Sequence, residues 1–384
     1  MKLLYLTHRC PYPPNKGERI RCFNILKHLA KHYEIHLACP VFSRDEIEQV
    51  ENCKAYAKSV ITTYINPYAA KARCLFSLFS KKPFTVSYFY SKKFKEIIQR
   101  QNFDIVLVDC SSMAQYAIDI EIPKIVDFVD IDSDKWKLYS RYSSLPKSII
   151  YHMEYRRIQL FENNINKQFN FCLVVSEDEK KLLQDGENVV IIPNGIDVEF
   201  FVPRAQQNDN TLIFTGAMNY FPNIDGVSYF HKDIWPLVKK HIQDVRFIVA
   251  GMSPPPKIRA LASEDTIITG FVSDVRDYLA QATVCIVPLR IAKGIQNKIL
   301  EAMAMGIPVV ATPAANAGIE ARDKHQILVA DSPEDFARAV LMLLKDPQLR
   351  KTIADNARQF VQENFSWDKN LSKLDELIAR LTKK

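Results

Sequence analysis

Short apolar runs rich in β-branched residues recur along the chain and alternate with stretches of helical periodicity. In the first half these runs lie at residues 3–8, 34–40, 59–65, 104–110, 124–130, 171–176 and 189–193. In the second half they lie at residues 212–216, 245–251, 266–271, 284–289, 308–312 and 327–330. Continuous apolar strands that alternate with helices are typical of parallel sheets covered on both faces. Two such series predict two doubly wound α/β domains.

The length of 384 residues is too great for one hydrophobic core and fits two domains. Between the two series, turn residues and a polar run at 206–210 indicate a linker. We therefore predict an N-terminal Rossmann-like domain over residues 1–194 and a C-terminal one over residues 195–365. Residues 366–384 predict a final amphipathic helix, which can return to the N-terminal domain.

The composition excludes several classes of protein. Apolar residues make up 47% and charged residues 25% of the chain, which is typical of a soluble globular protein. His8 and Arg9 break the first apolar run too early for a signal peptide, and no stretch approaches the roughly 20 apolar residues of a transmembrane helix. We therefore expect a cytoplasmic protein. The eight cysteines include no C-x-x-C pair, so we expect buried, reduced thiols.

Basic and aromatic residues are interleaved between residues 54 and 100. This window holds ten basic residues and one acidic residue, Glu96. The pattern suits peripheral contact with an anionic membrane surface, and it equally suits a solvated basic face over ordinary core aromatics. Tyrosines and arginines at helical spacing in residues 148–169 leave the same two alternatives open, a lipid contact or a structural helix. We do not expect nucleic acid as a partner.

Residues 288–308 carry the strongest functional signal. A buried strand ends at Leu289, a basic loop follows, and a helix of strong helix formers begins after Gly294. The free N–H groups and the dipole at such a helix start favour a phosphate. Lys298 adds a full charge one turn in, and Glu301 can accept the two hydroxyls of a ribose. The candidate donor-binding residues here are Arg290, Lys293, Gly294, Ile295, Gln296, Asn297, Lys298 and Glu301.

This run resembles the E-x7-E region of retaining GT-B glycosyltransferases of family 4. Residues 215–223 and 270–276 resemble the donor-domain loops of the same family. Residues 7–17 and 126–136 are similar to those of the sugar transferases found with exosortase and exopolysaccharide loci in bacteria. The resemblance covers essentially the whole chain.

The resemblance implies a GT-B fold, in which two Rossmann-like domains face each other across a cleft. It implies a hexosyltransferase that takes a nucleotide-sugar as co-substrate on the C-terminal domain and requires no metal or other cofactor. The acceptor would be a saccharide on the N-terminal domain, and the basic and aromatic residues of that domain suggest a lipid-linked saccharide at the inner face of the cytoplasmic membrane. Exopolysaccharide biosynthesis is the expected role.

The sequence departs from the family pattern at two places. The first Glu of E-x7-E is replaced by Lys293, so the usual contact with the donor sugar is missing. The Arg and Lys that clamp the diphosphate after the first strand of the C-terminal domain are also absent, and the loop there contains Gly216 and Asn219. Both are candidate donor contacts. We predict that Lys298, Lys293 or Arg290 supplies the missing positive charge.

The N-terminal domain offers further candidates. Gly17 would let the backbone approach the donor, and Arg19 and Arg21 would contact the acceptor unless they are helix-surface charges. Asp127 and Asp130 follow a strand and are candidate catalytic groups, or alternatively capping and turn-forming residues.

A metal site at these aspartates is not expected. A calcium loop starting at Asp130 would need Gly and Glu where Lys135 and Arg141 stand. The Asp130-Ile131-Asp132 run resembles the metal motif of the GT-A fold, which the doubly wound C-terminal half argues against.

Two other functions remain open. A nucleotide-sugar epimerase on the same fold would convert its donor without an acceptor. A catalytically inactive GT-B subunit would act as a binding partner, and the Lys293 substitution is the feature in its favour.

Overall fold

The computed structural model describes residues 1–14, 17–183, 186–205, 210–292 and 294–382. It divides the chain into two compact units. Unit 1 comprises residues 1–193 and 370–384, and unit 2 comprises residues 194–369. The chain therefore crosses between the units after Pro193, next to the expected boundary at 194–195.

The sheet of unit 1 has seven parallel strands in the order β3-β2-β1-β4-β5-β6-β7. They are β1 Lys2–Leu6, β2 Glu34–Val41, β3 Ser59–Tyr64, β4 Ile105–Asp109, β5 Lys124–Asp127, β6 Phe171–Val174 and β7 Val189–Ile191. The central strands are buried on both faces, which is why their apolar residues are continuous and do not alternate.

The helices of unit 1 begin at capping side chains in several places. Ser43, Asn66, Ser91 and Ser176 each accept a backbone N–H of the helix that follows. The helical segments are α1 Gly17–Leu29, α2 Arg44–Glu51, η1 Asn52–Ala55, α3 Pro67–Phe76, η2 Ser77–Phe79, α4 Phe84–Tyr88, α5 Lys92–Gln99, η3 Ser111–Tyr116, α6 Asp132–Tyr142, α7 Lys147–Gln168 and α8 Glu177–Leu182.

The last helix, α17 Trp367–Thr382, belongs to unit 1 from Asn370 onward. Its apolar stripe is buried, and the stripe consists of Leu371, Leu374, Leu377 and Ile378. Asp375 on the same helix accepts a hydrogen bond from Nε2 of His28 on α1 at 2.7 Å. The chain thus returns to the N-terminal unit at its end.

The sheet of unit 2 has six parallel strands in the order β10-β9-β8-β11-β12-β13. The strands are β8 Thr211–Thr215, β9 Arg246–Ala250, β10 Thr266–Gly270, β11 Val284–Val287, β12 Val309–Ala311 and β13 Leu328–Val329. The helical segments are α9 Phe221–Tyr229, η4 Phe230–Ile234, α10 Trp235–Lys239, α11 Pro256–Arg259, α12 Arg276–Leu279, α13 Asn297–Ala304, α14 Pro313–Asn316, α15 Pro333–Lys345 and α16 Pro347–Asn364.

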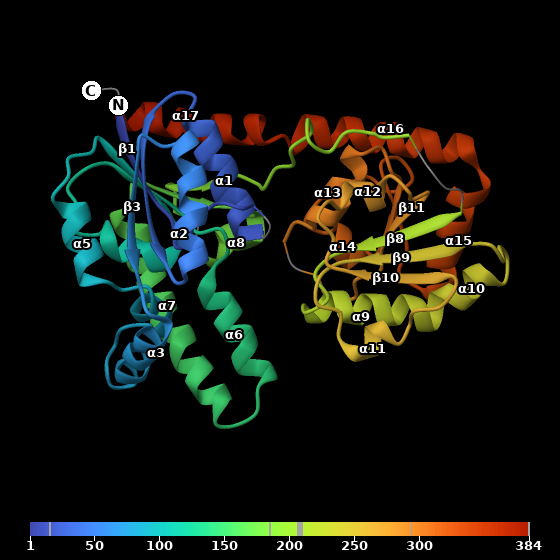
Figure 1. Ribbon diagram of the computed structural model, residues 1–384, viewed down its shortest axis with the longest axis horizontal. Coiled ribbons are helices and arrows are strands. Elements are labelled where there is room, and N and C mark those ends of the chain that lie inside the picture. Colours follow the sequence, from blue (N-terminus) through green and yellow to red (C-terminus); the bar gives the residue numbers. More distant parts are fainter. Residues whose placement is uncertain (15–16, 184–185, 206–209, 293, 383–384) are drawn as a thin grey trace. The chain divides into compact units, whose positions relative to one another are not determined.

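Helices cover both faces of the unit 2 sheet, with α9 and α11 on one side and α13 and α16 on the other (Figure 1). The prediction of two doubly wound α/β domains is therefore confirmed. In each sheet the strand order reverses beside the first strand, between β1 and β4 in unit 1 and between β8 and β11 in unit 2. Ligands of such sheets bind beyond the carboxyl ends of the strands at this switch point.

Two further expectations can be compared with the structure. All eight cysteines are free, and six of them are buried. Among the residues that the structure describes, no helix is long and apolar enough to cross a bilayer.

Candidate functional site

At the switch point of unit 2, three elements bring Gly216, Asn223 and Lys298 together. Gly216 follows β8, Asn223 lies on α9, and Lys298 lies in the first turn of α13. The Lys298 ammonium donates a hydrogen bond to Oδ1 of Asn223 at 2.6 Å. A Cβ on Gly216 would lie 2.8 Å from the Asn223 amide nitrogen and 3.0 Å from the Lys298 nitrogen, and the φ of Gly216 is +146°. Only glycine leaves this surface open.

Lys298 is a buried cation with a neutral partner. Its side chain is 9% exposed, and its nitrogen lies 4.2 Å from the centroid of the Phe214 ring. Burial lowers its pKa to about 8. Burial raises the pKa of nearby Glu301 to about 7, although the positive charge of Lys298 opposes that shift. Within the described part of the chain, Lys298 forms no direct ion pair. A bound anion would supply the missing countercharge.

Polar atoms next to these residues lack partners. Thr215 Oγ1, at the end of β8, and Asn297 Oδ1, at the start of α13, are buried without a hydrogen bond. Gln296 directly precedes α13 and is half-buried. An unsatisfied buried polar atom costs about 1–3 kcal/mol. A ligand with phosphate and hydroxyl groups would satisfy these atoms together with the N–H groups of the helix start.

Close glycine contacts fix the loops that surround Lys298. A Cβ on Gly251, after β9, would lie 1.8 Å from the carbonyl oxygen of Gly216. A Cβ on Gly318 would lie 2.3 Å from the carbonyl oxygen of Gly294, which has a φ of +62°. Side chains at these positions would push the loop ahead of α13 or the end of β8 out of place.

The other predicted donor-binding residues do not join the cluster of Gly216, Asn223 and Lys298. Arg290 makes two hydrogen bonds to Asp225 on α9, at 2.6 and 3.0 Å, and its guanidinium lies 4.8 Å from the Tyr229 ring centroid. Arg290 is therefore paired with α9, and the prediction that it supplies the missing phosphate charge finds no support in this geometry. Asn219 is exposed, and Ile295 is half-buried in the loop before α13. Lys293 lies outside the described residues.

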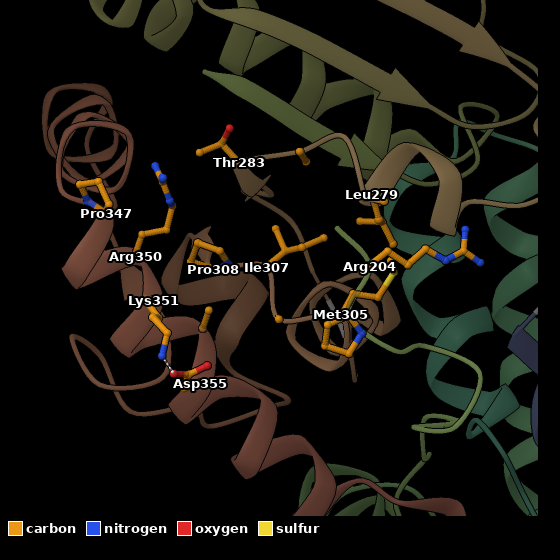
Figure 2. Close-up of a pocket in the computed structure, with 15 residues that line it drawn as sticks. Arg204, Leu279, Thr283, Met305, Ile307, Pro308, Pro347, Arg350, Lys351 and Asp355 are labelled. Atoms are coloured by element: carbon orange, nitrogen blue, oxygen red, sulfur yellow. Dashed lines mark hydrogen bonds and ion pairs between the residues drawn. The ribbon is translucent and has the colours of Figure 1, made fainter. Parts of the chain in front are cut away.

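A cavity of about 320 Å³ lies at the other end of unit 2 (Figure 2). Thr283 and Pro308 in its lining precede β11 and β12, and Met305 follows the last residue of α13. The cavity is thus at the amino ends of the strands and at the opposite end of α13 from Lys298. Lys351 and Asp355 in its wall pair with each other at 3.1 Å. This position is not the ligand-binding edge of a doubly wound sheet.

In unit 1 the switch point carries a histidine–aspartate pair. His8 follows β1, and Asp109 is the last residue of β4. Nδ1 of His8 lies 2.6 Å from Oδ2 of Asp109. Asp109 is fully buried, whereas the His8 side chain is 14% exposed and can be reached from solvent. Burial opposes the charge on His8, but Cys110 and Asp109 raise its pKa well above the ordinary value. The buried Asp109 carboxylate beside Nδ1 therefore favours the protonated imidazole.

Strained backbone accompanies this pair. Cys110 has a φ of +63° directly after β4, and Val129 has a φ of +61° just after β5. Such conformations cost about 1–3 kcal/mol each in residues other than glycine, and they cluster at functional sites.

The side chains of His8, Asp109 and Cys110 could also hold a metal ion, because their ligand atoms lie within 4.8 Å of one another. The 2.6 Å contact between Nδ1 of His8 and Oδ2 of Asp109 is a direct hydrogen bond, so a metal would have to use Nε2 of His8 and Oδ1 of Asp109, or open this bond.

Two predicted residues of unit 1 are buried in a mutual ion pair. Nε and Nη2 of Arg21 donate to the two carboxylate oxygens of Asp127 at 2.6 and 3.0 Å. Asp127 is 0% exposed and Arg21 is 1% exposed. The pair joins α1 to β5 inside unit 1, so neither side chain faces an open site, and this geometry gives no support to a catalytic Asp127 or to an acceptor contact by Arg21.

The remaining predictions for unit 1 fall at the ends of elements. Arg19 donates to Glu46 at 3.1 Å and to Gln49 at 3.3 Å, so it is bound to α2 and does not face an open site. Asp130 is exposed after β5. Gly17 is exposed at the first position of α1, with open space where a Cβ would stand.

Several candidate residues were not predicted from the sequence: His8, Asp109, Thr215 and Asn223. Their positions in the sequence could have indicated them. His8, Asp109 and Thr215 end or follow strands of the predicted sheets, and Asn223 lies shortly after Gly216. The prediction rests on strand-end glycines and on the aspartates that end or follow residues 124–127, and it gives no role to these four side chains.

Two family models match the chain in succession. Residues 17–200 match the model described as Glycosyltransferase Family 4, and residues 209–346 match the one described as Glycosyl transferases group 1. Each match spans most of one of the two doubly wound domains. The chain belongs to the glycosyltransferases of the GT-B type. Within them, unit 1 is similar to family 4 and unit 2 to group 1.

Known proteins resemble the chain over much or all of its length. A Klebsiella pneumoniae protein described as an uncharacterized 44.6 kDa protein in the cps region is 24% identical, over 97% of this chain and 98% of that protein. An Escherichia coli UDP-Gal:alpha-D-GlcNAc-diphosphoundecaprenol alpha-1,3-galactosyltransferase is 20% identical, over 58% of this chain and 62% of that protein. The structure of Anabaena HepE in complex with UDP-glucose has a TM-score of 0.70 at 14% identity, and the match covers 99% of this chain and 100% of that one.

Proposed function

We propose that this glycosyltransferase moves a sugar from a nucleotide-diphosphate donor, bound by unit 2, to a saccharide or lipid-linked saccharide acceptor bound by unit 1. The observation that carries the proposal is Lys298. It is a buried cation with a neutral partner, and it lies beside Gly216 at the switch point of a doubly wound sheet.

The donor would place its diphosphate over Gly216. Lys298 and the N-terminal N–H groups of α13 would then stabilise the negative charge that grows on the diphosphate as the sugar leaves. Glu301 would accept the ribose hydroxyls. Burial disfavours the charged form of the Glu301 carboxyl, and hydrogen bonds from the ribose hydroxyls would favour that charged form. The charge comes from the protein itself, so the proposed reaction needs no metal.

In unit 1, where the acceptor would bind, we assign to His8 a role in binding the acceptor. A protonated imidazole cannot take the acceptor proton, but it can donate a hydrogen bond to an acceptor oxygen or to a diphosphate. The bond from the anomeric carbon to the diphosphate oxygen breaks, and a bond to the acceptor oxygen forms on the same face of the sugar. The acceptor proton passes to the departing diphosphate. This course retains the anomeric configuration, as the family resemblance implies.

The relatives support the choice of substrates. The E. coli relative is named for UDP-Gal and for a sugar linked to diphosphoundecaprenol, and the Klebsiella relative for the cps region. The E. coli name supports a lipid-linked acceptor, and the Klebsiella name supports a role in exopolysaccharide biosynthesis.

Nucleotide affinity should depend on pH through Lys298. The free ammonium has a pKa of about 8, and a bound diphosphate favours its charged form. The affinity for UDP, GDP or dTDP should therefore fall about 20-fold between roughly pH 7.5 and 9.5, as the free enzyme loses this proton. Calorimetric titration measures the change. Lys298→Arg keeps its charge across this range and should give a flat profile, whereas an equally steep fall in that variant would rule out Lys298 as the titrating group.

His8→Asn tests the acceptor half. Asparagine can still donate to Asp109 but carries no charge, so the KM for a polyprenyl-diphosphate-linked monosaccharide should rise about tenfold or more. The dissociation constant for the nucleotide should stay unchanged. His241→Asn, on the exposed surface of unit 2, is the matched control. A variant with normal KM for the acceptor would exclude the role assigned to His8.

One assay separates the proposal from its two rivals. The purified protein is incubated with UDP-, GDP- or dTDP-sugars, alone and with a bacterial lipid extract, and the products are analysed by mass spectrometry and chromatography. We expect a sugar added to a lipid only when both are present. An isomerised donor formed without lipid would indicate the epimerase. Tight nucleotide binding with neither product nor hydrolysis would indicate the inactive binding subunit.

A further inference from the structure

Helices α6 and α7 form a hairpin that extends beyond the sheet of unit 1 (Figure 1). We call residues 139–150, where the two helices join, the hairpin tip. Large apolar side chains of the tip are exposed: Tyr139 (45%), Tyr142 (85%), Leu145 (73%), Ile149 (62%) and Ile150 (38%). Single exposed apolar residues are ordinary, but five within twelve residues at a protruding end indicate a contact surface.

The charge around the tip has one sign. Residues 135–153 contain four basic residues and no Asp or Glu. Arg141 and Lys147 on the tip itself are exposed. Tyrosines and aliphatic residues flanked by Lys and Arg are the combination that enters the headgroup region of an anionic bilayer.

A second exposed apolar group lies beside α7. Arg157 of α7 donates to the carbonyl oxygens of Ser77 and Leu78, at 2.8 and 3.1 Å, which fixes the end of α3 against the hairpin. Figure 1 shows α3 next to α7 on the side of unit 1 from which the hairpin projects. The exposed apolar side chains of α3 include Tyr68, Leu75 and Phe76.

The hairpin is held firmly at its base. Glu154 of α7 accepts hydrogen bonds from the backbone N–H groups of Phe84 and Thr85, at 2.7 and 2.8 Å. Nearer the tip, the rings of Trp136, Tyr139 and Tyr151 contact one another and join the two helices. Docking through the tip would therefore cost little ordering entropy.

We propose that the hairpin tip inserts into the headgroup region of an anionic lipid bilayer, with the exposed face of α3 beside it. The tip lies outside the basic and aromatic window at 54–100 that the sequence indicated, whereas α3 lies within it. Phe94 of that window is fully buried, but Tyr68 and Phe76 on α3 are exposed. The biological meaning rests on the proposed function, since a lipid-linked acceptor lies at such a surface. The binding itself requires no catalysis.

Vesicle binding tests the inference directly. The full chain is sedimented with phosphatidylcholine vesicles and with vesicles containing roughly 30% phosphatidylglycerol, without donor or acceptor. We expect binding to the anionic vesicles that weakens in about 1 M salt, where charges are screened within about 3 Å. Tyr142→Ser/Leu145→Ser/Ile149→Ser should lose at least about tenfold in affinity, and Arg141→Gln/Lys147→Gln roughly tenfold.

A control removes three exposed apolar side chains elsewhere, Ile47 (47%), Ile267 (44%) and Met342 (46%): Ile47→Ser/Ile267→Ser/Met342→Ser should bind as the wild type does. Unchanged vesicle binding by the tip variant, or no binding by the wild type, would overturn the inference. A dimer in light scattering that the tip variant abolishes would also overturn it, because a second copy would then cover the tip. Transfer to a detergent-solubilised acceptor by the tip variant shows separately whether the proposed function holds.

Discussion

Replacement of Lys298 by alanine is expected to weaken the binding of a nucleoside diphosphate about 100-fold. A hydrogen bond to a charged group contributes about 1.5–3 kcal/mol, and this ammonium is also the buried charge nearest to Gly216. Calorimetric titration with UDP, GDP and dTDP measures the loss. Lys345→Ala, which removes an exposed lysine from α15, should leave the affinity unchanged.

A second variant shows that this loss is electrostatic. Lys298→Met keeps most of the side-chain volume next to Phe214 and removes the charge, so it should lose affinity as alanine does. Its melting temperature without ligand should not fall, because the buried ammonium is costly in the free protein. If Lys298→Met kept the wild-type affinity, the positive charge would not be what holds the donor.

Arg21→Met is expected to destabilise unit 1 by about 3–5 kcal/mol, because it leaves the Asp127 carboxylate buried and unpaired. The melting temperature of this unit should fall by roughly 10 °C. Asp127→Leu should have a similar effect through the unpaired guanidinium. Thermal denaturation followed by circular dichroism measures both.

The double variant Arg21→Met/Asp127→Leu separates a structural pair from a catalytic one. Replacing both partners of a buried ion pair by apolar residues is often neutral, so most of the stability should return. The folded double variant should also keep its transfer activity. If it folds but has lost transfer with nucleotide binding intact, Asp127 would be a catalytic residue despite its burial.

The sequence predicted the elements better than the partners of their side chains. Continuous β-branched runs are a local property, so the strands of both sheets and the switch-point edge could be read from them. Arg21 and Asp127 are 106 residues apart, His8 and Asp109 are 101 apart, and Arg290 and Asp225 are 65 apart. No local pattern shows which charges meet across a folded unit.

The same reason explains which parts of the candidate site were found. Lys298 could be predicted because the strand, the glycine and the helix start that position it are adjacent in sequence. Its contact with Asn223 depends on α9, which is 75 residues away. The sequence indicated a lipid contact as one of two alternatives for residues 148–169, but it did not locate the exposed tip at 139–150, because the exposure of an aromatic residue is decided by packing and hydropathy alone does not reveal it.

The central claim is that unit 2 binds its donor through the diphosphate. The most direct measurement is a calorimetric titration of the unmodified protein with UDP, GDP and dTDP and with the corresponding nucleosides. At least one diphosphate should bind about 100-fold more tightly than its nucleoside, because in the proposed site Lys298 and the start of α13 would contact only the phosphates. Equal affinities for nucleoside and diphosphate, or no binding of any diphosphate, would contradict the account.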